Sequence, residues 1–100
     1  MKNFRTFDLA VEFYRLSQSL MVPGHLKEQL LRASSSIALN LAEGSGRATK
    51  PDQARFYSIA LGSLRECQAI VDLAVTNNTL VSEVSDKLAA HIYKLIKSRR

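Results

Sequence analysis

The sequence predicts an all-α protein that folds as an antiparallel four-helix bundle with up-down-up-down topology. Apolar residues recur at helical spacing through nearly the whole chain, and no segment alternates with the period-two pattern of a strand. Breaks that contain Gly, Pro or Asn divide this pattern into four segments, and the short connections favour antiparallel neighbours. With 100 residues, the chain is expected to form one domain over residues 1–100.

The first two helices are expected over residues 7–21 and 26–43, separated by a turn at Pro23-Gly24. Each carries apolar residues at spacings of three and four, so each can bury one face. Gly44 is interpreted as the residue that ends the second helix, because glycine adopts the left-handed conformation of a helix C-terminus at little cost.

The third helix is expected to begin at Thr49 as N-cap, with Pro51 in its first turn, and to run to about residue 75. It has three apolar stripes, and no residue between Arg55 and Arg65 is charged. Three other helices cannot cover a helix that is apolar on most sides, so this helix predicts a subunit interface. The fourth helix is expected to begin with Ser82 as N-cap and to continue into the basic tail.

Positive charge is predicted to gather at one end of the bundle, which we call the basic pole. The net charge is +5, and the topology brings together the start of the first helix, the loop between the second and third, and the end of the fourth. Three acidic residues, Asp8, Glu43 and Asp52, oppose nine basic ones there. The nine basic residues are Lys2, Arg5, Arg47, Lys50, Arg55, Lys94, Lys97, Arg99 and Arg100. If subunits pack side by side in parallel, the poles merge into a face that attracts the phosphate backbone of RNA or DNA. The alternative is that these are ordinary solvated termini and loops.

Composition and motifs argue against several other classes of protein. An apolar content of 46% with 23% charged residues is typical of a globular protein. We expect no signal peptide, no membrane span and a cytoplasmic location. Cys67 is interpreted as a core side chain, as is His91, and neither His25 nor His91 has a metal-ligand partner one turn away. No catalytic residue, metal or cofactor is therefore expected.

Two segments carry a resemblance to a known family. They are Gln29-Leu30-Leu31-Arg32-Ala33 followed by Ser36-Ile37-Ala38-Leu39-Asn40-Leu41-Ala42-Glu43-Gly44-Ser45-Gly46-Arg47, and Phe56-Tyr57-Ser58-Ile59-Ala60-Leu61-Gly62-Ser63-Leu64-Arg65-Glu66. The chain resembles the bacterial four-helix-bundle family of 23S ribosomal RNA intervening-sequence proteins. The resemblance implies a homopentamer of antiparallel bundles. It also implies a relation to a basic pentameric accessory protein of diversity-generating retroelements, which binds nucleic acid and a reverse transcriptase.

The polar residues of these segments also have a physical interpretation. Five of them recur at spacings of 3, 4, 4 and 3, and therefore form one stripe along the second helix. They are Gln29, Arg32, Ser36, Asn40 and Glu43. Ser63 and Glu66 are expected to face this stripe from the third helix. Since buried charges must be paired, we hypothesise an Arg32–Glu66 ion pair, with Asn40 and Glu43 tying the second helix to the loop.

The sequence thus favours a non-catalytic adaptor that assembles with copies of itself. The adaptor is expected to bind RNA or DNA through the basic pole and to have a protein partner. The alternative is a protein-interaction scaffold whose exposed apolar surface docks a partner and whose charge only confers solubility. An enzyme would require a pocket with convergent polar groups.

Overall fold

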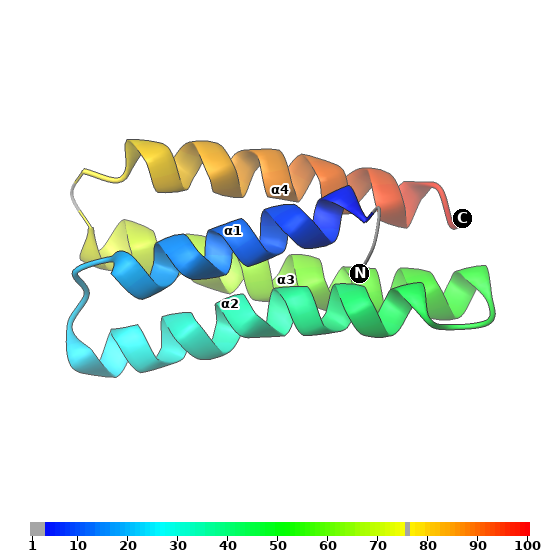
Figure 1. Ribbon diagram of the computed structural model, residues 1–100, viewed down its shortest axis with the longest axis horizontal. Helices are drawn as coiled ribbons and strands as arrows, with labels where there is room; N and C mark the ends of the chain where they lie inside the picture. The colour runs from blue at the N-terminus through cyan, green and yellow to red at the C-terminus, as the bar shows by residue number, and fades with distance from the viewer. Residues whose placement is uncertain (1–3, 76) are drawn as a thin grey trace.

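The computed structural model describes residues 4–75 and 77–100, and within them it contains four helices and no strand (Figure 1). The helices are α1 (Arg5–Ser19), α2 (Gly24–Ser45), α3 (Lys50–Ala74) and α4 (Thr79–Lys97). Successive helices run in opposite directions, and each packs against two neighbours in the cyclic order α1, α2, α3, α4. The molecule measures 40 × 23 × 22 Å, and the predicted all-α fold is confirmed.

The core lies along the axis between the four helices and follows the predicted apolar stripes. Phe13, Ile37, Leu64 and Leu88 are each fully buried, one from each helix. Met21, which the sequence predicts to be the last residue of the first helix, is 92% exposed because α1 ends at Ser19. None of the described helices is both long and apolar enough to cross a bilayer.

Gly44 does not end α2, and that prediction is wrong. The helix continues through Ser45, and its C-cap is Gly46, whose φ of −90° and ψ of −4° are right-handed. Gly44 is buried, and a Cβ on it would lie 2.7 Å from Cε1 of Tyr57. The position therefore requires glycine because α2 and α3 approach closely, and not because of a left-handed backbone.

The starts of α3 and α4 differ in how well the sequence predicts them. Thr49 is the N-cap of α3 as predicted, and its side chain accepts a hydrogen bond from the backbone N–H of Asp52 at 3.3 Å. Ser82 is not the N-cap of α4, so that prediction is wrong. The helix begins at Thr79, and its N-cap residue is Asn78. The N–H of Ser82 donates to the carbonyl of Asn78 within the first turn, so the helix has already formed there.

The end of α1 is capped by a side chain from the next helix, which the sequence did not predict. The Lys27 Nζ atom donates hydrogen bonds to the carbonyl oxygens of Ser17, Gln18 and Leu20, the first two at 3.0 and 2.7 Å. The last carbonyls of a helix have no partner within the helix and carry partial negative charge. Lys27 therefore satisfies them and links the end of α1 to the first turn of α2.

Candidate nucleic-acid interface

The basic pole exists, but it is less compact than the sequence predicted. The loop between α2 and α3 lies at the same end of the bundle as the C-terminal end of α4 (Figure 1). The start of α1 lies on this half too, but it begins beside α4 and stops short of that loop (Figure 1). Of the nine predicted basic residues, Lys2 falls outside the described residues. Among the other eight, Arg99 is half-buried and the rest are exposed.

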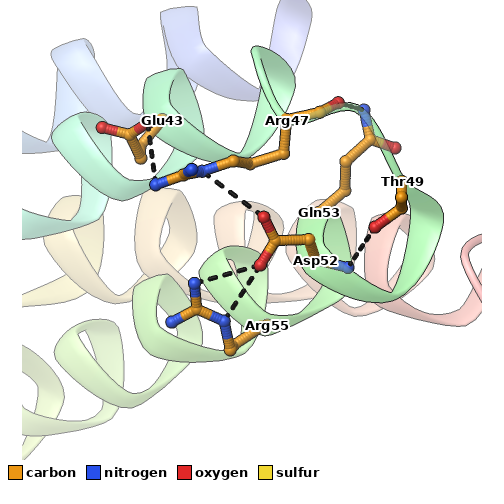
Figure 2. Close-up of polar contacts among 6 residues, drawn as sticks. All are labelled: Glu43, Arg47, Thr49, Asp52, Gln53 and Arg55. Atoms are coloured by element: carbon orange, nitrogen blue, oxygen red, sulfur yellow. Dashed lines mark hydrogen bonds and ion pairs between the residues drawn. The ribbon is translucent and has the colours of Figure 1, made fainter.

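Two arginines of the basic pole are engaged by acidic side chains (Figure 2). Asp52 Oδ1 lies 3.0 Å from Nη2 of Arg55, and its Oδ2 lies 3.5 Å from Nε of Arg47. Arg47 also lies 3.4 Å from a carboxylate oxygen of Glu43, one turn back along the chain. Because these contacts are partly exposed to water, each contributes about 0–1 kcal/mol to stability. Their larger effect is to neutralise and position the two guanidinium groups.

The ring of Phe56 holds the same two arginines. Arg55 Cζ lies 4.3 Å from the ring centroid, and Arg47 Cζ lies 4.6 Å from it. These distances are typical of cation–π contacts. Arg47 and Arg55 are therefore fixed against the protein by an aromatic ring and by carboxylates.

The end of α4 is tied to the start of α3. Nε of Arg99 donates to Oε1 of Gln53 at 3.1 Å, and Nε2 of Gln53 donates to the backbone carbonyl of Arg47 at 3.3 Å. The Arg99 guanidinium also lies over the ring of Tyr57, 5.6 Å from its centroid. Sequence reasoning missed Gln53, since residues 46 apart give no local pattern that would reveal the contact.

Two basic residues of the pole, Arg5 and Lys94, lie with Lys87 and His91 where the start of α1 meets α4, and we call these four residues the α1–α4 flank. Lys87, His91 and Lys94 are spaced four and three residues apart, so they share one side of α4. Partial burial and the positive charges of Arg5, Lys94 and Lys87 lower the pKa of His91 from 6.5. His91 is half-buried, so its interpretation as a core residue is wrong. Lys87 and His91 are the residues of this surface that the sequence analysis did not select.

The polar stripe of α2 is formed in part. The hydroxyl groups of Ser36 and Ser63 lie 3.0 Å apart across the contact between α2 and α3, and Nδ2 of Asn40 donates to both the hydroxyl and the carbonyl of Ser36. Glu43 contacts the loop through Arg47, as predicted, whereas Asn40 bonds within its own helix and not to the loop.

The predicted Arg32–Glu66 ion pair is not formed within the single chain, so that prediction is wrong. Arg32 instead lies 3.4 Å from Glu28 on its own helix, with both side chains more than three-quarters exposed. Glu66 and Gln29 are also exposed. Ser36 and Ser63 are in contact, and α2 and α3 are antiparallel. Arg32, four residues before Ser36, and Glu66, three residues after Ser63, therefore lie at similar positions along the bundle axis, and both are exposed.

The outer surface shared by α2 and α3 is apolar, and we call it the α2–α3 face: Leu39, Ile59, Gly62, Ala69 and Leu73. Leu39 is 67% exposed, Ile59 43% and Leu73 78%. Gly62 and Ala69 lie between them and are also exposed. Apart from Leu39 of α2, these residues form the third apolar stripe of α3, and the single chain leaves them exposed, as the sequence predicted.

Three features bear on catalysis. Cys67 is buried as predicted, and burial raises the pKa of its thiol to about 12, which leaves it unreactive. A cavity of about 270 Å³ lies between α3 and α4, with Phe13 of α1 and the carboxylates of Asp72 and Asp86 on its wall. Its lining includes Gln68 and Ser85, which are hydrogen-bonded to each other at 3.2 Å. The described residues contain no cluster of three or more metal-ligating side chains.

A protein-family model matches nearly the whole chain. The family model described as 23S rRNA-intervening sequence protein matches residues 4–98, which include all four helices and the loop of the basic pole. No curated protein sequence matches the chain.

Proposed function

The chain belongs to the 23S rRNA-intervening sequence protein family, and from this premise we propose that it is a small non-catalytic adaptor. It assembles with copies of itself and binds a nucleic-acid backbone through the basic pole. The observation that carries this proposal is the gathering of basic side chains at one half of an elongated bundle. Arg5, Lys50, Lys94 and Lys97 are exposed there, and among the described residues none of them lies in an ion pair. Such a surface attracts phosphates without reading sequence.

The α2–α3 face supports the proposal of self-assembly. Leu39, Ile59 and Leu73 would expose apolar side chains to water in a monomer, and a second copy would cover them. Glu66 lies between Gly62 and Ala69 along this stripe and is exposed, and among the described residues it forms no ion pair, so a neighbouring copy can offer it a basic partner. The resemblance described above implies five subunits in a ring, and parallel packing in a ring would merge the basic poles.

The test is binding of a labelled RNA duplex and a DNA duplex of the same sequence across a series of salt concentrations, followed by fluorescence anisotropy. We expect the logarithm of the association constant to fall linearly with the logarithm of salt concentration, by about 0.9 for each phosphate contact. Reversing the charges of Lys50, Lys94 and Lys97 should abolish binding. Absence of binding by the wild-type protein at low salt would refute the proposal.

A second candidate function is a protein-interaction scaffold, and the same α2–α3 face favours it. In this alternative the apolar face docks a different protein, and the charge confers only solubility. Recovery of one defined protein in a pull-down, with no absorbance from co-purified nucleic acid, would favour the scaffold. Loss of that protein on changing Leu39 and Ile59 to aspartate would place the contact on this face.

A further inference from the structure

The basic side chains of the protein differ in how far they are already engaged. Arg47 and Arg55 share the carboxylate of Asp52 and the ring of Phe56 (Figure 2). A phosphate that approached them would compete with Asp52 and Glu43 and would meet their negative charge. The loop between α2 and α3 is therefore a poorer phosphate site than its sequence indicates.

The α1–α4 flank has the opposite character. Within the described chain, Arg5, Lys87 and Lys94 form no ion pair and no side-chain hydrogen bond, and all three are exposed. They are close enough for their positive charges to act on His91. The start of α1 lies against α4 at this level (Figure 1), which brings Arg5 to the residues of α4. Asp8 lies one turn from Arg5 on α1 and Glu83 lies one turn from Lys87 on α4, but neither carboxylate forms an ion pair with these cations.

The charged side chains that lower the pKa of His91 are all basic. Arg5 comes from α1, and Lys87 and Lys94 come from α4 itself. The other helix packed on α4 is α3, and it lies on a different side, where Gln68 contacts Ser85. Ser85 and His91 are six residues apart, which places them on different faces of the helix.

We propose that a nucleic-acid backbone lies along the α1–α4 flank, on Arg5, Lys87, His91 and Lys94, and that protonation of His91 strengthens this binding. The inference rests on the proposed function and assigns its main phosphate contacts. Lys87 and Lys94 are seven residues apart, or about 10 Å along the helix axis. That length covers about three nucleotide steps of one strand at ~3.4 Å each.

The sign of the pH dependence follows from the charges. In the free protein, partial burial and the neighbouring cations disfavour the imidazolium form of His91. A phosphate bound between these cations offsets their repulsion and accepts a hydrogen bond from the imidazolium, so the protonated form is favoured in the complex. Binding therefore takes up a proton, and affinity rises as the pH falls towards and below the pKa of His91, which the neighbouring cations and partial burial hold below 6.5 in the free protein.

The experiment compares four variants of the full-length protein with wild type, using the labelled RNA duplex of the salt series as probe. His91→Gln removes the titrating group, and His25→Gln is the matched control, since His25 is the second histidine and lies at the start of α2. Lys87→Gln/Lys94→Gln removes two charges from the flank. Arg47→Gln/Arg55→Gln removes the same number from the loop and the start of α3.

We expect wild type and His25→Gln to bind several-fold more tightly at about pH 5.5 than at about pH 7.5, and His91→Gln to lose this difference. The flank double variant should lower the slope of the salt dependence by about one for each lost phosphate contact, and more than the loop double variant does. Circular dichroism of each variant checks that the bundle is intact.

The outcomes separate the two proposals. No binding by wild type refutes the proposed function itself. Binding that depends on Arg47 and Arg55 but not on Lys87 and Lys94 leaves the function in place and overturns the flank as its site. A pH dependence that survives in His91→Gln overturns the role of His91.

Discussion

Gly44 of α2 packs so closely against Tyr57 of α3 that a Cβ atom on Gly44 would lie 2.7 Å from Cε1 of the tyrosine ring. Tyr57 is 1% exposed, so its ring has little room to move. The same Cβ would lie 3.0 Å from Cβ of Phe56. The absence of a side chain at this one position therefore sets how near the two helices come at the basic pole.

Gly44→Ala should destabilise the protein, although alanine is the better helix former. Overpacking a filled core costs about 1–3 kcal/mol, whereas replacing glycine by alanine within a helix gains about 1 kcal/mol. We expect a net loss of about 1 kcal/mol in the free energy of unfolding, measured by urea denaturation. Gly24→Ala is the control, because no atom lies within 4 Å of a Cβ built there. Equal unfolding midpoints for the two variants would contradict the close contact.

The sequence predicts those parts of the fold that depend on local periodicity. The apolar stripes of α2 and α4 identify Ile37 and Leu88 as core residues, because a period of 3.6 residues leaves little choice of buried face. Thr49 and Pro51 locate the start of α3 for the same local reason. The exposed stripe of α3 follows from counting apolar residues around one helix.

The errors arise where a local signal has two physical meanings or where the partner is distant. Glycine near a helix end marks either a left-handed cap or a close approach, and at Gly44 only the neighbouring Tyr57 decides between them. Ser82 has the chemistry of an N-cap, but α4 starts earlier without a side-chain cap. The Gln53–Arg99 hydrogen bond joins residues whose proximity only the folded bundle determines.

Lys27→Met tests the cap on α1. Methionine keeps the apolar stem of the side chain but removes the ammonium group that donates to three carbonyl oxygens, including those of Ser17 and Gln18. Loss of charge-assisted hydrogen bonds at a helix C-terminus should lower the free energy of unfolding by about 1–2 kcal/mol. Lys87→Met is the matched control at an exposed position, where the expected change is within about 0.5 kcal/mol. Similar thermal midpoints for both would show that Lys27 is not an important cap.

Aspartate in place of both Leu39 and Ile59 should prevent self-assembly. The two residues lie on neighbouring helices of the α2–α3 face. In an assembly, each aspartate would be a charge buried against a second copy, which is unfavourable, whereas burial of leucine or isoleucine is favourable. A loss of about 3 kcal/mol per interface weakens association by more than about 100-fold. Light scattering coupled to size exclusion should show a monomer for this variant and the wild-type mass for Leu80→Asp, whose side chain is 59% exposed at the start of α4. A wild-type protein that stays monomeric would contradict the assembly.

Cys67 should resist alkylation while the bundle is folded. Burial raises the pKa of its thiol to about 12, and at about pH 8 the reactive thiolate is then a minor species that also lies inside the core. Mass spectrometry after treatment with iodoacetamide should find no adduct in the native protein and one adduct in denaturant. Ser58→Cys provides an exposed thiol on the same helix, and it should be labelled rapidly under native conditions. Native labelling of both thiols at similar rates would mean that the core opens readily at α3.

Asp52→Asn should strengthen nucleic-acid binding while slightly weakening the fold. The carboxylate contacts both Arg47 and Arg55, so its removal frees Arg55, leaves Arg47 with Glu43 alone and raises the net charge of the basic pole by one. The backbone N–H of residue 52 would still donate to Thr49, which preserves the N-cap of α3. The lost charge at a helix N-terminus should cost about 0.5–1 kcal/mol in the free energy of unfolding. Asp72→Asn changes the net charge equally at the other end of α3, so only Asp52→Asn should raise affinity and steepen the salt dependence by about one contact. Equal effects of the two variants would mean that Arg47 and Arg55 do not contact the phosphates. The change in affinity would then come only from long-range electrostatic attraction.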